Sequence, residues 1–122
     1  IIPKDNNLEI LVNRESFINS LRIVSSISSE KLRPVKLIIS PGVLRLESEK
    51  AEYGEVVDEI EAGYEGEAFQ IGFNARYLLD VLGVIDSDDV ILECKNSMSP
   101  TIIKSSTDES FLSVIMPLRV EW

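Results

Sequence analysis

Carboxylates are the most abundant reactive side chains in this sequence, and nine of them lie between residues 47 and 67 with a single lysine. Paired carboxylates can act as general acid and base on glycosides, and clustered carboxylate oxygens can bind Mg²⁺ or Ca²⁺. The segment contains no calcium-loop motif, however, and successive strand residues point to opposite faces, so its side chains do not all converge. We interpret it as a solvated acidic face or a charged sheet edge, with a small carboxylate hydrolase as the weaker alternative.

The sequence lacks the residues that most other catalytic mechanisms and metal sites require. The chain has no histidine, which excludes Ser-His-Asp and Cys-His catalysis and zinc binding by imidazole. Its one cysteine, Cys94, follows Val90 and Leu92 in an apolar strand pattern, which predicts a core thiol and agrees with a reducing cytoplasm. No phosphate-binding or dinucleotide-binding glycine motif, secretory signal or transmembrane run is present. We therefore expect a cytoplasmic protein without a cofactor or metal.

The last residues, 114–120, are apolar apart from Arg119, although chain ends are usually polar. Pro117 cannot donate a hydrogen bond to a sheet, so strand pairing should stop there. Two interpretations stay open. Val114 and Met116 belong either to a last core strand or to a hydrophobic groove that receives a partner peptide.

The predicted elements follow the same order in both halves of the 122 residues. Each half shows a strand, an amphipathic helix and three further strands. The helices begin after Asn13 and Asn74, which are 61 residues apart and suited to cap a helix. This predicts an α+β fold with a duplicated βαβββ unit, halves of about 1–66 and 67–122, two helices on one side and two antiparallel sheets on the other. The strands are predicted at 8–12, 35–40, 44–47, 56–60, 69–73, 90–94, 101–105 and 111–116, and the second helix is expected to include Ile85.

Acidic and basic residues are concentrated in different segments of the chain. Residues 47–67 carry −8 of the net −9, whereas residues 10–33 carry four basic and two acidic side chains. A net acidic chain is unlike a free-standing nucleic-acid binder, which is usually basic. The sorting instead predicts a molecule with a mildly basic helical side and an acidic sheet side.

Three stretches resemble the C-terminal third of the bacterial DNA polymerase III beta subunit family, the sliding clamps. They are GFNARYLLDVL at 72–82, SMSP at 97–100 and VIMPLRV at 114–120, and SEKLR at 29–33 is similar to the family's first helix exit. The resemblance implies a DNA-clamp fold and the third domain of a three-domain chain, two copies of which form a ring around duplex DNA. It also implies a non-catalytic processivity factor without a membrane segment. Its partners would be the DNA polymerase III catalytic subunit, the clamp loader and repair proteins. A free-standing peptide-binding adaptor is the alternative.

The resemblance also implies site residues in this sequence. A peptide-binding cleft would be formed by Asn74, Tyr77, Met98, Pro100, Val114, Met116, Pro117, Leu118 and Arg119. Basic residues facing DNA would be Arg22, Lys31, Arg33 and Arg76. The dimer seam would include Ile27, Glu52, Glu55 and Asp58. Glu121 and Trp122 extend beyond the usual end of the family motif, which leaves the openness of the cleft to be established.

Overall fold

The two halves of the chain have the same order of elements, as the sequence predicts. The computed structural model describes residues 7–25, 34–50 and 54–120. The first half contains β1 (Leu8–Asn13), α1 (Arg14–Ser25), β2 (Pro34–Ser40), β3 (Val43–Lys50) and β4 (Gly54–Glu61). The second contains β5 (Phe69–Asn74), α2 (Ala75–Val84), β6 (Asp89–Cys94), β7 (Thr101–Ser105) and β8 (Leu112–Ile115). The duplicated βαβββ unit is thereby confirmed.

Two four-stranded antiparallel sheets interlock the halves. Their strand orders are β1-β6-β7-β8 and β4-β3-β2-β5, so each half contributes its first strand to the sheet of the other half. Ile10 of β1 lies opposite Leu92 of β6, and Leu37 of β2 lies opposite Ile71 of β5. All four side chains are buried. Because of this exchange, neither half can bury its apolar strands without the other.

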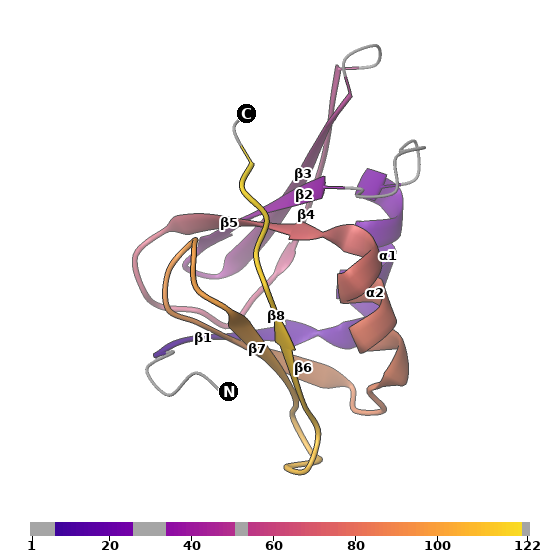
Figure 1. Cartoon of the computed structure of the whole chain (residues 1–122), viewed down its shortest axis with the longest axis vertical. Helices are drawn as coiled ribbons and strands as arrows, with labels where there is room; N and C mark the ends of the chain where they lie inside the picture. The colour runs from indigo at the N-terminus through magenta and orange to yellow at the C-terminus, as the bar shows by residue number, and fades with distance from the viewer. Residues whose placement is uncertain (1–6, 26–33, 51–53, 121–122) are drawn as a thin grey trace.

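The helices lie side by side along one flank of the sheets (Figure 1). Asn13 Oδ1 accepts the backbone N–H of Ser16 at 2.9 Å, and Asn74 Oδ1 accepts that of Arg76 at 2.9 Å, so both predicted caps are confirmed. Each helix buries an apolar stripe and exposes its opposite face. The stripes are formed by Phe17, Leu21 and Val24 in α1 and by Leu78 and Leu82 in α2.

Two element boundaries differ from the sequence-based expectation. The second helix ends at Val84, and Ile85 is its buried C-cap residue instead of a helical one. The last strand covers only Leu112–Ile115, because Met116 turns away from the sheet before Pro117. Both boundaries are set by backbone hydrogen bonds, which apolar spacing does not record.

Glu47 corrects the view of residues 47–67 as uniformly solvated. It is 6% exposed and lies directly opposite Lys36 in the register of β2 and β3. Its carboxylate is 3.7 Å from Lys36 Nζ and 2.7 Å from Arg45 Nε. A buried charge needs such partners. Glu47 therefore has a structural role as an ion-pair partner within the sheet.

Candidate functional site

The C-terminal segment passes from one sheet to the other. After β8, residues 116–120 cross the outer edge of β5, as Figure 1 shows. The Leu118 N–H donates to Gly72 O at 2.8 Å. A Cβ at residue 72 would lie 2.7 Å from Leu118 O and 2.7 Å from Val120 Cγ1, so only glycine allows this approach. Pro117, which lacks an N–H, stands where the chain leaves one sheet and before it reaches the other.

A groove of about 460 Å³ lies between α2 and this segment. Val114 and Met116 are 40% and 62% exposed, whereas Ile115 between them is buried. This alternation decides between the two interpretations of the chain end: Ile115 completes the core, and its neighbours form an open apolar surface. Tyr77 of α2, 59% exposed, stands on the other wall. The lining residues are Asn74, Tyr77, Asp80, Val81 and residues 113–118.

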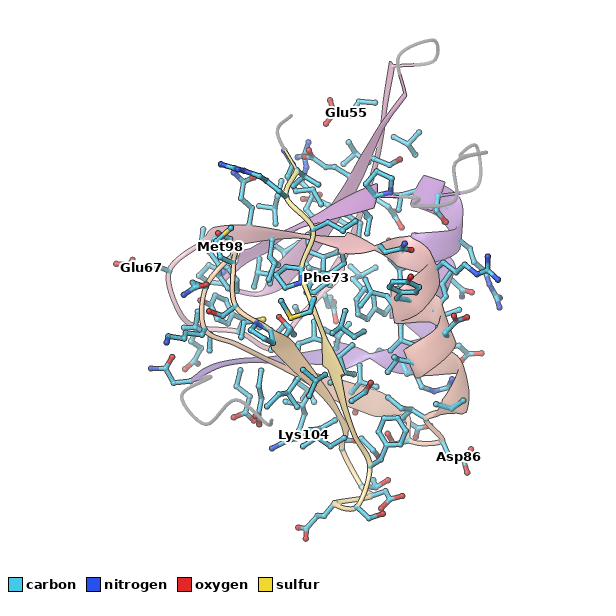
Figure 2. All side chains as sticks on the ribbon, in the orientation of Figure 1. Glu55, Glu67, Phe73, Asp86, Met98 and Lys104 are labelled. Atoms are coloured by element: carbon cyan, nitrogen blue, oxygen red, sulfur yellow. The ribbon has the colours of Figure 1, made fainter. Side chains whose placement is uncertain are left out.

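A smaller hollow of about 210 Å³ lies on the far side of the C-terminal segment. Met98 contributes from the turn after β6 (Figure 2). Asn96 holds that turn, because its Oδ1 accepts the backbone N–H groups of Met98 and Ser99 at 2.9 and 2.8 Å. The lining residues are Gln70, Ile71, Gly72, Ser97, Met98, Leu118, Arg119 and Val120.

The structure brings most of the predicted cleft residues together. Those on the groove are Asn74, Tyr77, Val114, Met116, Pro117 and Leu118, while Met98, Leu118 and Arg119 line the smaller hollow. Pro100 lines neither. Asn74 is buried, and its Oδ1 is already engaged in capping α2. Sequence reasoning missed Asp80 and Val81, although both follow Tyr77 at helical spacing, and it missed Ser113, Ile115, Gln70, Ile71, Gly72, Ser97 and Val120.

The exposed helix faces are close to electrically neutral. Arg22 and Arg76 are exposed as predicted, but Glu15 and Asp80 are exposed on the same helices. Arg14 is held at the end of α2, where its Nη1 and Nε donate to Leu82 O and to Ser87 O, each at 3.1 Å. Lys31 and Arg33 lie outside the described residues.

The acidic segment forms a sheet edge. β4 pairs with β3 and stands at one end of its sheet. Glu55 is exposed on the part of the β3–β4 hairpin that projects from the body (Figure 2), and Asp58 is half-buried. Ile27 and Glu52 lie outside the described residues. The two hollows beside residue 63 each hold one carboxylate of residues 47–67, and within the described part of the chain no acidic or cysteine cluster is arranged to bind a metal ion.

Cys94 is a core residue, as its strand position predicts. The side chain is 1% exposed and accepts a hydrogen bond from the Thr101 hydroxyl at 3.6 Å. Burial raises the pKa of the thiol to about 11, so it is protonated at neutral pH. In the part of the chain that the structure describes, no helix is long and apolar enough to cross a membrane.

Comparison with known proteins decides the family. The family described as "DNA polymerase III beta subunit, C-terminal domain" matches residues 1–119. The chain belongs to this family. The beta sliding clamp of Caulobacter vibrioides is 41% identical over 120 residues, which are 98% of this chain and 32% of the relative. That of Bacillus subtilis is 32% identical over 122 residues and is covered to the same extent.

Solved sliding clamps share the fold. A Caulobacter crescentus clamp with polyethylene glycol bound to a putative beta-motif tethering region matches 98% of this chain, with a TM-score of 0.94 and 41% identity. A Bartonella birtlesii clamp bound to griselimycin has a TM-score of 0.94 and 37% identity over 98% of this chain. The chain covers 32% of each of these two proteins. It therefore spans about a third of the sliding clamps that it matches.

Proposed function

We propose that residues 1–122 act as the third, C-terminal domain of a replicative sliding clamp. In this function two three-domain chains close into a ring around duplex DNA and hold the polymerase on it, without catalysing a reaction. The family membership and the coverage of one third of each relative support the assignment. The interlocked sheets support it as well, because they make the segment one complete unit that can be repeated around a ring.

The observation that carries the proposal is the open apolar groove between α2 and residues 113–118. Apolar grooves with a few polar groups suit short hydrophobic peptides, and flexible Met116 allows the surface to adapt. We infer that the groove receives peptides of the polymerase III catalytic subunit, the clamp loader and repair proteins. The clamps solved with griselimycin and with polyethylene glycol show that related proteins bind ligands.

The helices are proposed to face the DNA. Arg22 and Arg76 supply positive charge, and Glu15 and Asp80 offset it. Attraction to DNA grows with the number of phosphates that are neutralised, so a nearly neutral surface binds weakly and permits sliding. In such a ring, encirclement and not affinity keeps the protein on DNA.

The free edge of β4 is proposed as the third domain's side of the dimer seam. An edge strand presents unpaired backbone groups, and its acidic side chains oppose pairing with like edges. Glu55 and Asp58 would therefore favour a basic edge in the first domain of the partner copy. The seam closes the ring only in the complete three-domain chain.

The groove is tested by replacing Met116 with alanine in the full-length gene product. We expect affinity for a labelled hydrophobic peptide of the polymerase III catalytic subunit to fall by about 1–3 kcal/mol, because Met116 is a central apolar contact. Fluorescence anisotropy gives the Kd. Val84→Ala is the matched control, since Val84 is 70% exposed on α2, the helix beside the groove, but does not line the groove. Equal affinity of Met116→Ala and the unaltered protein would contradict the docking function.

A further inference from the structure

The groove contains one side chain that is charged at neutral pH. Asp80 lines it together with amide, hydroxyl and apolar residues. The side chain is exposed, and among the described residues its carboxylate forms no hydrogen bond or ion pair. A carboxylate without a partner in the protein can form an ion pair with a cationic group of a ligand.

The position of Asp80 places that charge beside the apolar contacts. It follows Tyr77 by three residues on α2, and side chains at this spacing are neighbours on a helix. Val81 comes next and also lines the groove, facing the wall that contains Val114 and Met116. Asp80 and the apolar residues Tyr77 and Met116 therefore line the same groove.

The nearest described cations do not line the groove with Asp80. Arg76 lies one turn earlier on α2 and is exposed, but it does not line the groove. Arg119 lines the smaller hollow on the far side of the C-terminal segment. The two hollows consequently differ in sign, with a carboxylate in the larger and a guanidinium in the smaller.

We propose, on the basis of the docking function above, that Asp80 makes the groove select apolar peptides that carry a basic residue at the end that lies along α2. The carboxylate attracts an ammonium or guanidinium group of the peptide. The pair stays accessible to solvent, so its effect is moderate and depends on salt. The apolar residues supply most of the affinity, while Asp80 discriminates between competing partners.

The test uses one hydrophobic clamp-binding peptide with lysine, glutamine or glutamate appended at either end, titrated against the full-length gene product. When the added residue is at the peptide end that lies along α2, we expect the lysine peptide to bind about two- to fivefold more tightly than the glutamine peptide at low salt. The glutamate peptide should bind more weakly than the glutamine peptide. At 0.5 M NaCl the differences should shrink. Asp80→Asn should abolish the preference, so that the lysine, glutamine and glutamate peptides bind this variant about equally.

Asp86→Asn is the matched control, because it removes the same charge beyond the far end of α2 (Figure 2). It should retain the full preference for lysine. If Asp80→Asn retains the preference, or if Asp86→Asn loses it equally, the selectivity belongs to the overall negative charge and the proposal is wrong. Failure of the glutamine peptide to bind the unaltered protein would instead contradict the docking function itself.

Discussion

Each half of the molecule has a place where the chain crosses the outer edge of that half's first strand. In the first half, residue 63 crosses β1 at Leu11, and Gly63 N–H donates to Leu11 O at 2.8 Å. In the second, residue 118 crosses β5 at Gly72, and Leu118 N–H donates to Gly72 O at 2.8 Å. Leu11 and Gly72 are 61 residues apart, which is the spacing of the two helix caps. The two strand residues that are crossed therefore occupy equivalent positions in the repeat.

Glycine and leucine exchange places between the two crossings. At the first, glycine is on the crossing segment, and a Cβ there would meet Leu11 Cβ at 3.3 Å. At the second, glycine is on the strand, and a Cβ would meet the backbone oxygen of Leu118 at 2.7 Å. A separation of 3.3 Å needs a shift of only a few tenths of an ångström, whereas at 2.7 Å from the Leu118 carbonyl oxygen the crossing segment itself must move.

The surroundings of the crossings differ as well. After Gly63 the chain continues into buried Tyr64, whose hydroxyl donates to Glu67 O at 2.7 Å. Carboxylates line the hollows beside this crossing, which contain Glu9, Glu61, Glu65 and Asp89. The second crossing is flanked by the apolar groove. The same hydrogen-bonded crossing of a strand edge thus fixes a connecting segment in the first half and holds one wall of an open apolar surface in the second.

The largest effect is expected from Gly72→Ala. The new methyl group would displace Leu118 and Val120 from β5, because both lie 2.7 Å from its position. We expect the free energy of unfolding to fall by roughly 3 kcal/mol, as in overpacked cores. Affinity for the hydrophobic peptide should fall as well, since Pro117 and Leu118 would no longer be held at the groove. Urea unfolding and anisotropy titrations measure the two losses.

Gly63→Ala is the matched variant for this comparison. Its methyl group would lie 3.3 Å from Leu11 Cβ and 3.7 Å from Leu11 O, contacts that a shift of a few tenths of an ångström relieves. We expect a loss of about 1 kcal/mol or less and an unchanged peptide affinity. Equal losses in the two variants would show that the crossings are equivalent in packing as well as in position.

The repeat could be predicted from sequence because it depends on local signals. Alternation, helical spacing and the two asparagine caps all lie within single elements. The crossings could not be predicted in this way. Gly72 stands inside a strand pattern, and nothing near it in sequence shows that residues 118 and 120 pack against it. The burial of Glu47 has the same origin, because its partner Lys36 lies on another strand.

The candidate site could be predicted only in part, because local patterns mark its residues but contacts between distant segments shape it. The motif at the chain end marked Met116 and Leu118, but composition alone could not decide between core and groove. That decision came from the alternation of exposed Val114, buried Ile115 and exposed Met116. Asp80 was not predicted because the sequence pattern of the terminal segment does not indicate which helix face lies opposite it.

Alkaline pH should affect the first crossing. Burial raises the pKa of Tyr64, and the nearby Cys94 adds to this rise. Burial also raises the pKa of Cys94 to about 11. A raised pKa stabilises the folded state fully below the unfolded value near 9, and this contribution is lost as pH rises through the folded value. At pH 10.5 we expect Cys94 to have lost roughly 2 kcal/mol of its contribution.

Urea unfolding between pH 8 and pH 11 measures this loss, with Cys94→Ala as the control. The alanine variant should be less stable at every pH because a buried sulfur is removed, but its stability should fall less steeply above pH 9. Only the slope tests the titration. Parallel curves for the two proteins would mean that ionisation of Cys94 does not weaken the fold.

Small effects are also expected at the two helix caps, where the halves are most alike. Asn13→Ala and Asn74→Ala should each lower the free energy of unfolding by about 1 kcal/mol, because each removes the acceptor of a backbone N–H. Only Asn74→Ala should also lower peptide affinity, since Asn74 accepts the Tyr77 N–H at 3.4 Å and lines the groove. Asn74→Asp keeps the acceptor and should restore stability. If both alanine variants reduced peptide affinity equally, the effect would come from general loosening of the helices, and the groove would not depend on its own cap.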